Sequence, residues 1–279
     1  MKEWAATVHA TTRALAHRAR ADAASFEPLT SWAADAGAAP GGALRVEWVA
    51  TRDAERFGMT VFEHGAERGH LDAARALCAA HFDAAALKAW DESAEELTSL
   101  AVTSHVGLAW DKTQGYRLKL FIGRGPGLSE AARRLSLTPT VELVGVGCDF
   151  WIGGRYRARR YLRAADFASL AAHARPERAP AWPIPKRGHA VLTLTEPNDA
   201  LGHKTTFSVI FPRQATLDVL AGYPGVQSLE ALESLAAELA PFALRPSALE
   251  LDRHRSGREE LELLVTVEAP DSRPSGGPA

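Results

Sequence analysis

The sequence predicts an α+β fold in which ten β-strands, arranged as five antiparallel hairpins, close into a barrel that helices ring on the outside. Pairs of strand-like segments alternate with helix-like segments five times along the 279 residues, and recurrence at roughly 45–50 residues is typical of a repeat architecture. A parallel α/β sheet would instead alternate single strands with helices. Because about eight strands already make a barrel that side chains can fill, ten strands predict a ligand chamber at the centre. An open, strongly curved sheet is the alternative.

The hairpin at residues 144–161, VGVGCDFWIGGRYRARRY, shows the repeating unit most clearly. Its first strand is apolar and rich in β-branched and aromatic residues, and Gly153-Gly154 supplies the positive φ angles of a tight turn. Successive side chains of a strand point to opposite faces, so the return strand carries a polar row. This row consists of Arg155, Arg157, Arg159 and Tyr161. It predicts either an anion site or an exposed edge strand whose charges prevent aggregation.

Helices are expected before and between the five hairpins, where apolar residues recur at helical spacing. They are predicted over residues 2–24, 29–36, 71–82, 84–95, 165–174, 214–221 and 229–239, with a shorter one capped by Ser129. The other strand pairs are predicted at 44–51 and 55–64, 101–110 and 116–123, 189–195 and 204–211, and 244–252 and 259–267. The Pro-rich segment 175–188 is interpreted as a connection, because the same unit recurs after it. We therefore expect a single domain over residues 1–270, with N-terminal helices in 1–38 and a disordered tail at 271–279.

The composition is that of an ordinary globular chain with a net charge of −2, so no global basic surface points to nucleic acid. The two cysteines, Cys78 and Cys148, form neither a disulfide framework nor a metal-ligand spacing, which agrees with a reducing cytoplasm. The N-terminal residues lack the apolar core of a signal peptide, and no apolar run is long enough to cross a bilayer. We expect a cytoplasmic monomer with no nucleic-acid or membrane partner.

Cations recur at similar heights in the second strands of four hairpins. They are Arg56, Lys119, the pair Arg157 and Arg159, and Lys204. Guanidinium and ammonium groups suit phosphate oxygens, and each charge-assisted hydrogen bond contributes about 1.5–3 kcal/mol. Four strands in register therefore predict one polyanion, such as a diphosphate, bound at the centre of the chamber.

Glu47, in the first strand, is interpreted either as a buried carboxylate that accepts a proton or as half of an exposed cross-strand pair. The Gly-rich segment 123–127, GRGPG, lacks the order of a phosphate-binding P-loop and is interpreted as a turn. Five histidines have no metal-ligand spacing, so no protein-built metal site is predicted. They are His64, His70, His105, His189 and His203.

Five units of this kind, closing a ten-strand barrel, resemble the aromatic prenyltransferases of the ABBA type, whose fold is called the PT barrel. The resemblance is strongest to the cyanobactin-type peptide prenyltransferases and extends over about residues 26–268. Its short motifs are RFGMTVFE in the first unit, VGLAWDKTQGYRLKLFI in the second and GCDFWIGGR in the third. The chain lacks an Asp-rich DDxxD cluster, which argues against the helical class of prenyl-transfer enzymes.

The resemblance implies an enzyme of RiPP natural-product biosynthesis that moves a dimethylallyl or geranyl group from an isoprenyl diphosphate to a nucleophilic side chain of a (cyclic) peptide. It implies Glu47 as the catalytic base, with Arg45 competing for that position under a two-residue shift, and Mg²⁺ bridging the diphosphate. The diphosphate ligands would be Arg56, Lys119, Arg157, Arg159, Tyr161 and Lys204. The pocket for the prenyl group and the acceptor would contain Trp48, Trp110, Phe121, Asp149, Glu260 and Glu262. Trp151 is a further aromatic residue that could stabilise an allylic cation by cation–π attraction.

This chain departs from the family pattern at two places. Phe121 stands where a Tyr is expected, which removes a hydroxyl contact, and Glu260 and Glu262 stand where neutral or cationic groups would suit a diphosphate. If these two carboxylates face the chamber, they favour a cationic acceptor and predict that a peptide Arg is preferred over Tyr or Trp. The alternative is that they face solvent. A small-molecule aromatic prenyltransferase and a non-catalytic barrel that binds an anion or a peptide are the alternative functions.

Overall fold

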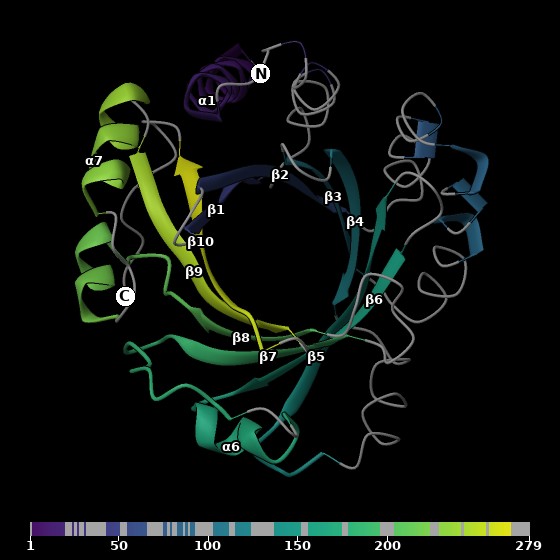
Figure 1. Ribbon diagram of the computed structural model, residues 1–279, viewed down its shortest axis with the longest axis vertical. Coiled ribbons are helices and arrows are strands. Elements are labelled where there is room, and N and C mark those ends of the chain that lie inside the picture. Colours follow the sequence, from purple (N-terminus) through teal and green to yellow (C-terminus); the bar gives the residue numbers. More distant parts are fainter. Residues whose placement is uncertain are drawn as a thin grey trace.

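The computed structural model contains ten β-strands, which pair in sequence order and close into a barrel where β1 meets β10. Figure 1 views the strands as a ring around a common axis. The strands are β1 Ala43–Ala50, β2 Glu55–Gly65, β3 Thr103–Asp111, β4 Gly115–Gly123, β5 Glu142–Trp151, β6 Tyr156–Ala164, β7 His189–Thr195, β8 Lys204–Ile210, β9 Ala243–His254 and β10 Glu259–Glu268. Every pairing is antiparallel. The predicted antiparallel sheet of hairpins, curled on itself, is confirmed.

The structure describes residues 2–19, 24, 27, 31, 43–50, 55–65, 75–76, 79, 83–85, 87–88, 90–92, 103–111, 115–123, 137–151, 156–174, 178–195, 204–223, 229–240, 243–254 and 257–268. In β1, β2 and β3 it describes the backbone but not the side chains. The predicted turn at Gly153-Gly154, the helix capped by Ser129, most of the helix at 29–36 and the tail at 271–279 lie outside the described residues.

The register of β5 and β6 shows how alternation along a strand separates two environments. Asp149 pairs with Arg157, while its neighbours Cys148 and Phe150 belong to the alternate row. Phe150 is buried on the outer side of the sheet, where its ring lies edge-on to Trp90 with 5.3 Å between ring centroids. The apolar row of the sheet therefore packs outward, and the polar row is left for the interior.

The helices that the structure describes lie on the outside of the ring of strands (Figure 1). The described helices are α1 Lys2–Ala19, α6 Phe167–Ala171, the 3₁₀ helix η2 Leu217–Gly222 and α7 Leu229–Glu238. Helix α6 begins at an N-cap, because the carboxylate of Asp166 accepts a hydrogen bond of 2.8 Å from the backbone N–H of Ser169. It is shorter than the predicted helix at 165–174, and η2 replaces the predicted α-helix at 214–221 with a tighter turn.

An aromatic cluster ties the Pro-rich segment 178–188 to the outside of the sheet. Trp182 lies edge-on to Tyr223 at 6.1 Å and to Phe167 at 6.3 Å, and Phe167 in turn meets Phe207 of β8 at 6.1 Å. The hydroxyl of Tyr223 donates a hydrogen bond of 2.8 Å to the carbonyl of Pro183. These contacts hold the segment against the barrel wall.

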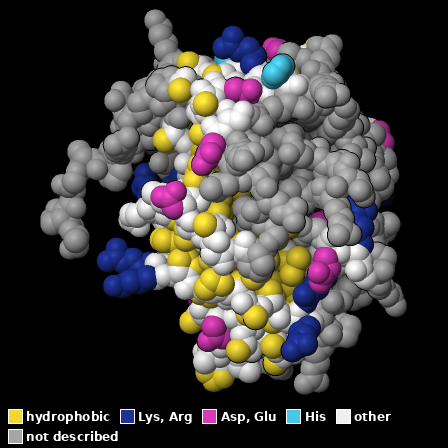
Figure 2. All heavy atoms as spheres, turned by 60° about the vertical axis from the view of Figure 1, so that its left-hand side comes forward, with side chains coloured by type: hydrophobic (Ala, Val, Ile, Leu, Met, Phe, Trp, Pro, Cys, Tyr) yellow, Lys and Arg dark blue, Asp and Glu magenta, His cyan; other side chains and the backbone are white. Residues whose placement is uncertain are grey.

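Figure 2 shows one outer face of the molecule, on which hydrophobic side chains gather in the middle and charged side chains lie around them. Among the residues that the structure describes, no helix has the length and apolar character needed to cross a membrane.

Substitution of Phe207 by Ala should destabilise the fold without touching the interior. Phe207 is fully buried between the sheet and the aromatic cluster, and the guanidinium of Arg253 lies 5.5 Å from its ring centroid. Removing a buried aromatic ring costs about 3–5 kcal/mol of unfolding free energy, which lowers Tm by about 6–20 °C in a chain of this size. Thermal unfolding followed by circular dichroism measures the shift.

The exposed Arg213, three residues after the end of β8, supplies the control. Arg213→Ala should change the unfolding free energy by no more than about 0.5 kcal/mol. Equal shifts in the two variants would contradict the outward packing of Phe207.

Candidate functional site

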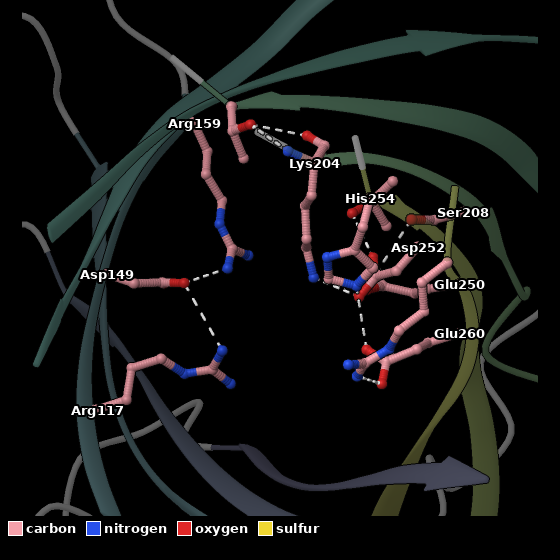
Figure 3. Close-up of polar contacts among 12 residues, drawn as sticks. Arg117, Asp149, Arg159, Lys204, Ser208, Glu250, Asp252, His254 and Glu260 are labelled. Carbon is pink, nitrogen blue, oxygen red and sulfur yellow. Dashed lines mark hydrogen bonds and ion pairs between the residues drawn. The ribbon is translucent and has the colours of Figure 1, made fainter. Parts of the chain in front are cut away.

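The polar row of the sheet collects charged side chains on the inner wall of the barrel. Figure 3 shows them in two groups that face each other, one from β4–β6 and one from β8–β10. We call the first group the cationic cluster; it consists of Arg117, Lys119, Asp149, Arg157, Arg159 and Tyr161. We call the second the acidic cluster; it consists of Lys204, Glu250, Asp252, Glu260 and Glu262. The formal net charges are +3 and −3, because the first has four cations and one carboxylate and the second has the reverse.

Asp149 is the carboxylate at the centre of the cationic cluster. Its Oδ2 atom accepts a hydrogen bond from Nη2 of Arg159 and lies 3.7 Å from Nη1 of Arg117. Lys119 on β4 and Arg157 on β6 are its cross-strand partners in the ladder, one on each side. The side chain of Asp149 is almost completely buried. One carboxylate of β5 thus lies among four cations of the two flanking strands, β4 and β6.

The charges in this cluster stabilise one another. Burial by itself would raise the pKa of Asp149, but the surrounding cations, Arg159 first among them, hold it below its ordinary value. Burial would lower the pKa of Arg159, and the charge of Asp149 raises it instead. Burial raises the pKa of Tyr161 to about 12, so its hydroxyl stays protonated and can donate a hydrogen bond to an anion. At neutral pH the cluster therefore offers cations and a neutral phenol.

Aromatic rings support the cations from the side. The guanidinium carbons of Arg117 and Arg157 lie 5.7 Å and 5.5 Å from the ring centroid of Trp151, which is itself 1% exposed. Both distances are in the range of cation–π attraction. Phe121 and Tyr161 meet edge-on at 5.0 Å. Aromatic side chains therefore pack against the cations of this cluster.

The acidic cluster on β8–β10 is more tightly paired. Asp252 accepts hydrogen bonds from Nζ of Lys204 and, at 2.5 Å, from the hydroxyl of Thr206. Ser208 donates a hydrogen bond of 3.1 Å to Glu250. Burial would raise the pKa of Asp252, but Lys204 and the two hydrogen bonds lower it below its ordinary value. The ammonium group of Lys204 on β8 is thus bonded to a carboxylate of the adjacent strand, β9.

A further contact lies where β9 ends and β10 begins. Glu260 accepts a hydrogen bond from the exposed Arg258, and its Oε2 lies 3.2 Å from Nε2 of His254. The possible metal ligands Asp252, His254 and Glu260 have one ligand atom each within 4.8 Å of one another. Mg²⁺ prefers an octahedral set of oxygen ligands. A histidine nitrogen with two carboxylates already bonded to Lys204 and Arg258 does not fit that preference.

The structure separates the predicted site residues into two sets. Tyr161 and Phe121 lie with the predicted ligands Lys119, Arg157 and Arg159, and Asp149 lies among them. Lys204 and Glu260 lie in the other cluster, and Glu262 is the ladder partner of Glu250 there. Sequence reasoning assigned no role to Glu250, Asp252 or His254. The alternation of acidic residues in ALELDRH, set against EELELL, is the signal that could have identified them.

Four predicted residues lie on strands of which the backbone alone is described. In the ladder, Glu47 pairs with Gly58 and Leu264, and Arg56 pairs with Val49. Trp48 pairs with Phe57 and Leu263. Trp110 pairs with Met59 and Tyr116. By register, Glu47 and Arg56 share one row of the sheet, and Trp48 and Trp110 share the alternate row.

Comparison with known proteins finds no matching family model and no matching curated protein. Solved structures do match. The chain is 16% identical to 5-dimethylallyltryptophan synthase from Streptomyces coelicolor, with a TM-score of 0.68 over 97% of this chain and 99% of that one. It is 15% identical to the prenyltransferase PriB, solved in a ternary complex with L-tryptophan and dimethylallyl thiolodiphosphate, with a TM-score of 0.65 over 96% of this chain and 98% of that one. The predicted resemblance to the aromatic prenyltransferases is confirmed at the level of the fold, and the narrower one to the cyanobactin family stays a prediction.

Substitution of Asp252 by Asn should reduce the loss of unfolding free energy that occurs as the pH falls below about 4. The pKa of Asp252 is lowered in the folded protein, so its contribution is present above its unfolded value of about 3.9 and is lost as pH falls through the lower folded value. Wild-type protein should therefore lose stability below about pH 4, by up to about 1.4 kcal/mol per pH unit for this one group. Urea unfolding between pH 2.5 and 7 measures both slopes.

Asp218→Asn, on the exposed side of η2, is the control and should leave the wild-type slope unchanged. The buried pair is incorrect if Asp252→Asn keeps the full wild-type acid limb.

Proposed function

We propose that this protein transfers a prenyl group, dimethylallyl or geranyl, from an isoprenyl diphosphate to a nucleophilic acceptor. The cationic cluster carries this proposal. It brings four cations and one neutral phenol from β4 and β6 to one place on the inner wall, with a net charge that complements a diphosphate. The fold supports the same conclusion, because both similar structures are dimethylallyl-transferring or prenyl-transferring enzymes by name.

The donor binds with its diphosphate against the cationic cluster. When the C–O bond breaks, its electron pair stays on the diphosphate oxygen and the prenyl group becomes an allylic cation. The negative charge that develops on the leaving oxygen is stabilised by guanidinium and ammonium groups that are already in place. Tyr161, protonated because burial raises its pKa, donates to the same oxygens. The diphosphate ligands proposed here are therefore those that the sequence predicts in this cluster: Lys119, Arg157, Arg159 and Tyr161.

The acceptor attacks the allylic carbon from the other side of the chamber, and a proton leaves the acceptor as the new bond forms. We propose Glu47 as the base that takes this proton. The proposal rests on the family resemblance and on the position of Glu47 in the ladder, between Gly58 of β2 and Leu264 of β10. Arg56 is proposed as a further diphosphate ligand on the same grounds.

A small aromatic molecule such as tryptophan is the acceptor we favour. Tryptophan accompanies the donor analogue in the similar PriB structure. The acidic cluster faces the cationic cluster across the inside of the barrel and would attract the ammonium group of such a molecule (Figure 3). A peptide acceptor of RiPP biosynthesis is the second candidate, and the same carboxylates would suit an arginine side chain in it.

Mg²⁺ is proposed as a partner of the diphosphate, following the family resemblance. The described carboxylates on the inner wall are bonded to cations and hydroxyl groups and do not form a ligand set for it. Bound through the diphosphate, the ion would neutralise charge on the leaving group, and the steps above depend on the protein's own cations.

Incubation with dimethylallyl diphosphate and tryptophan should add about 68 Da, one C5H8 unit, to the acceptor in the reaction class proposed here. Lys119→Ala should lower kcat/KM for the donor about ten- to hundredfold, which corresponds to about 1.5–3 kcal/mol for a charge-assisted bond. Mass spectrometry and steady-state kinetics measure the two effects.

Arg163→Ala is the matched control, because Arg163 lies on the same strand, β6, but pairs with the exposed Glu142 at 2.5 Å. It should leave kcat/KM within about twofold of wild type. If neither tryptophan nor any peptide gains mass with either donor, the non-catalytic alternative, a barrel that binds an anion or a peptide, replaces this proposal.

Acceptors with the same indole ring and different charge should be used at different rates. Tryptamine and tryptophan, which carry an ammonium group, should exceed indole-3-propionate at least tenfold in kcat/KM, equivalent to about 1.4 kcal/mol in the barrier. The reason is attraction to the acidic cluster. Glu250→Gln should reduce this preference, and a competition assay with product analysis measures it.

Peptides that differ in a single Arg, His, Trp or Tyr residue extend the comparison to the second candidate. An arginine peptide should be the best acceptor among them if the acidic cluster selects the acceptor. A tenfold advantage for the Trp or Tyr peptide, together with no preference among the indoles, would show that the acidic cluster is not an acceptor site.

A further inference from the structure

The motif GCDFW on β5 divides its side chains between two environments. Cys148 and Phe150 are buried in the outward row, where Phe150 meets Trp90. Asp149 and Trp151 belong to the inward row and both contact the arginines of the cationic cluster. The outward pair explains the apolar half of the motif. The inward pair needs a separate explanation.

A carboxylate is an unexpected group in a site for a diphosphate. Its charge repels the donor, and this repulsion is strong where water is excluded. Asp149 is 3% exposed, and the cations around it keep it ionised at neutral pH. A site selected for positive charge alone would have a neutral residue at this position.

The contacts of Asp149 show what the carboxylate does. A single oxygen, Oδ2, accepts from Nη2 of Arg159 and lies 3.7 Å from Nη1 of Arg117, so residues of β4 and β6 are joined across β5. An arginine side chain is long and loses rotamer freedom when it is ordered. The Nε–H of Arg159 is buried and has no hydrogen-bond partner among the residues that the structure describes, so it is available as a donor.

Trp151 acts on the same arginines from another direction. Its ring lies under the guanidinium groups of Arg117 and Arg157, at 5.7 Å and 5.5 Å. Arg117 is therefore held at one side by Asp149 and at the other by Trp151. Three arginines from two strands are thus fixed by two successive inward positions of β5, Asp149 and Trp151.

We propose that Asp149 is a positioning residue, which holds Arg159 and Arg117 in the orientation that receives the donor's diphosphate and does not itself contact the donor or the acceptor. This inference rests on the proposed function. It moves Asp149 from the acceptor pocket that the sequence predicts to the support of the donor site. Preorganised cations bind an anion more tightly because less freedom is lost on binding.

The direction in which the Kd for an anion changes when Asp149 is replaced separates a positioning role from simple repulsion of the donor. If Asp149 only repels the donor, removing its charge tightens the binding of an anion. If it positions Arg159 and Arg117, removing it weakens that binding although the site becomes more positive. Inorganic diphosphate is the probe, and its Kd is measured by isothermal titration calorimetry on full-length protein, together with kcat and KM for dimethylallyl diphosphate.

Asp149→Ala should weaken diphosphate binding at least tenfold and raise the donor KM by a similar factor, with a smaller change in kcat. Asp149→Asn keeps an oxygen acceptor at the same place, so it should lose only about two- to fivefold. If the Ala variant fails to fold, the Asn variant carries the test. Glu142→Ala, which removes an exposed carboxylate from the same strand, should stay within twofold of wild type.

A double-mutant cycle tests whether Asp149 acts through Arg159. Arg159→Gln alone should weaken binding, and adding Asp149→Asn to it should weaken binding by a smaller factor than Asp149→Asn does in wild-type protein, because one of the two guanidinium groups that Asp149 holds is gone. If the factors by which the two single substitutions raise Kd simply multiply in the double variant, the two residues act independently and the proposal is overturned. Tighter or unchanged binding by Asp149→Asn, with wild-type protein binding normally, would also overturn it. If wild-type protein neither binds diphosphate nor transfers a prenyl group, the proposed function falls together with this inference.

Discussion

Charge buried on the inner wall of a curled sheet is the constraint from which the rest of the site follows. Alternation along each strand sends every second side chain inward, and in this chain many of those positions are charged. An unpaired charge in such a place costs several kcal/mol, so each needs a partner within reach. Asp149 is paired with Arg159 across one hairpin, and Asp252 with Lys204 across two neighbouring strands. The pattern of ion pairs decides which cations can face a ligand and which are bonded to a carboxylate of a neighbouring strand.

This pairing leaves the two sides of the barrel with opposite charge. In the cationic cluster four cations outnumber one carboxylate, and in the acidic cluster four carboxylates outnumber one lysine. A field in this direction favours a negative group against β4–β6 and a positive group against β8–β10. In a prenyl transfer both charges appear during the reaction, because the leaving group is an anion and the migrating group is a cation. The arrangement suits separation of those charges in the transfer proposed above.

Stability and function use different rows of the same strands. The outward row is apolar and packs against α6, η2 and the aromatic cluster around Trp182 and Tyr223, so hydrophobic burial stabilises the barrel from outside. The inward row contributes charges whose pairing is close to neutral for stability. Inner residues can therefore vary with the ligand while the sheet persists, which is consistent with a shared fold at 16% identity.

The sequence by itself determined the local pattern. Turn residues, period-two alternation and the five-fold recurrence were sufficient to predict antiparallel hairpins and to place Arg157, Arg159 and Tyr161 on one face. They could not show which charged groups meet, because strand alternation specifies a face and not a partner. Lys204 and Asp252 are 48 residues apart, and the pairing of β8 with β9 brings them together. Only the tertiary structure decided that Lys204 binds Asp252 of the neighbouring strand and that Asp149 lies among cations. Both contacts depend on the register in which the strands pair.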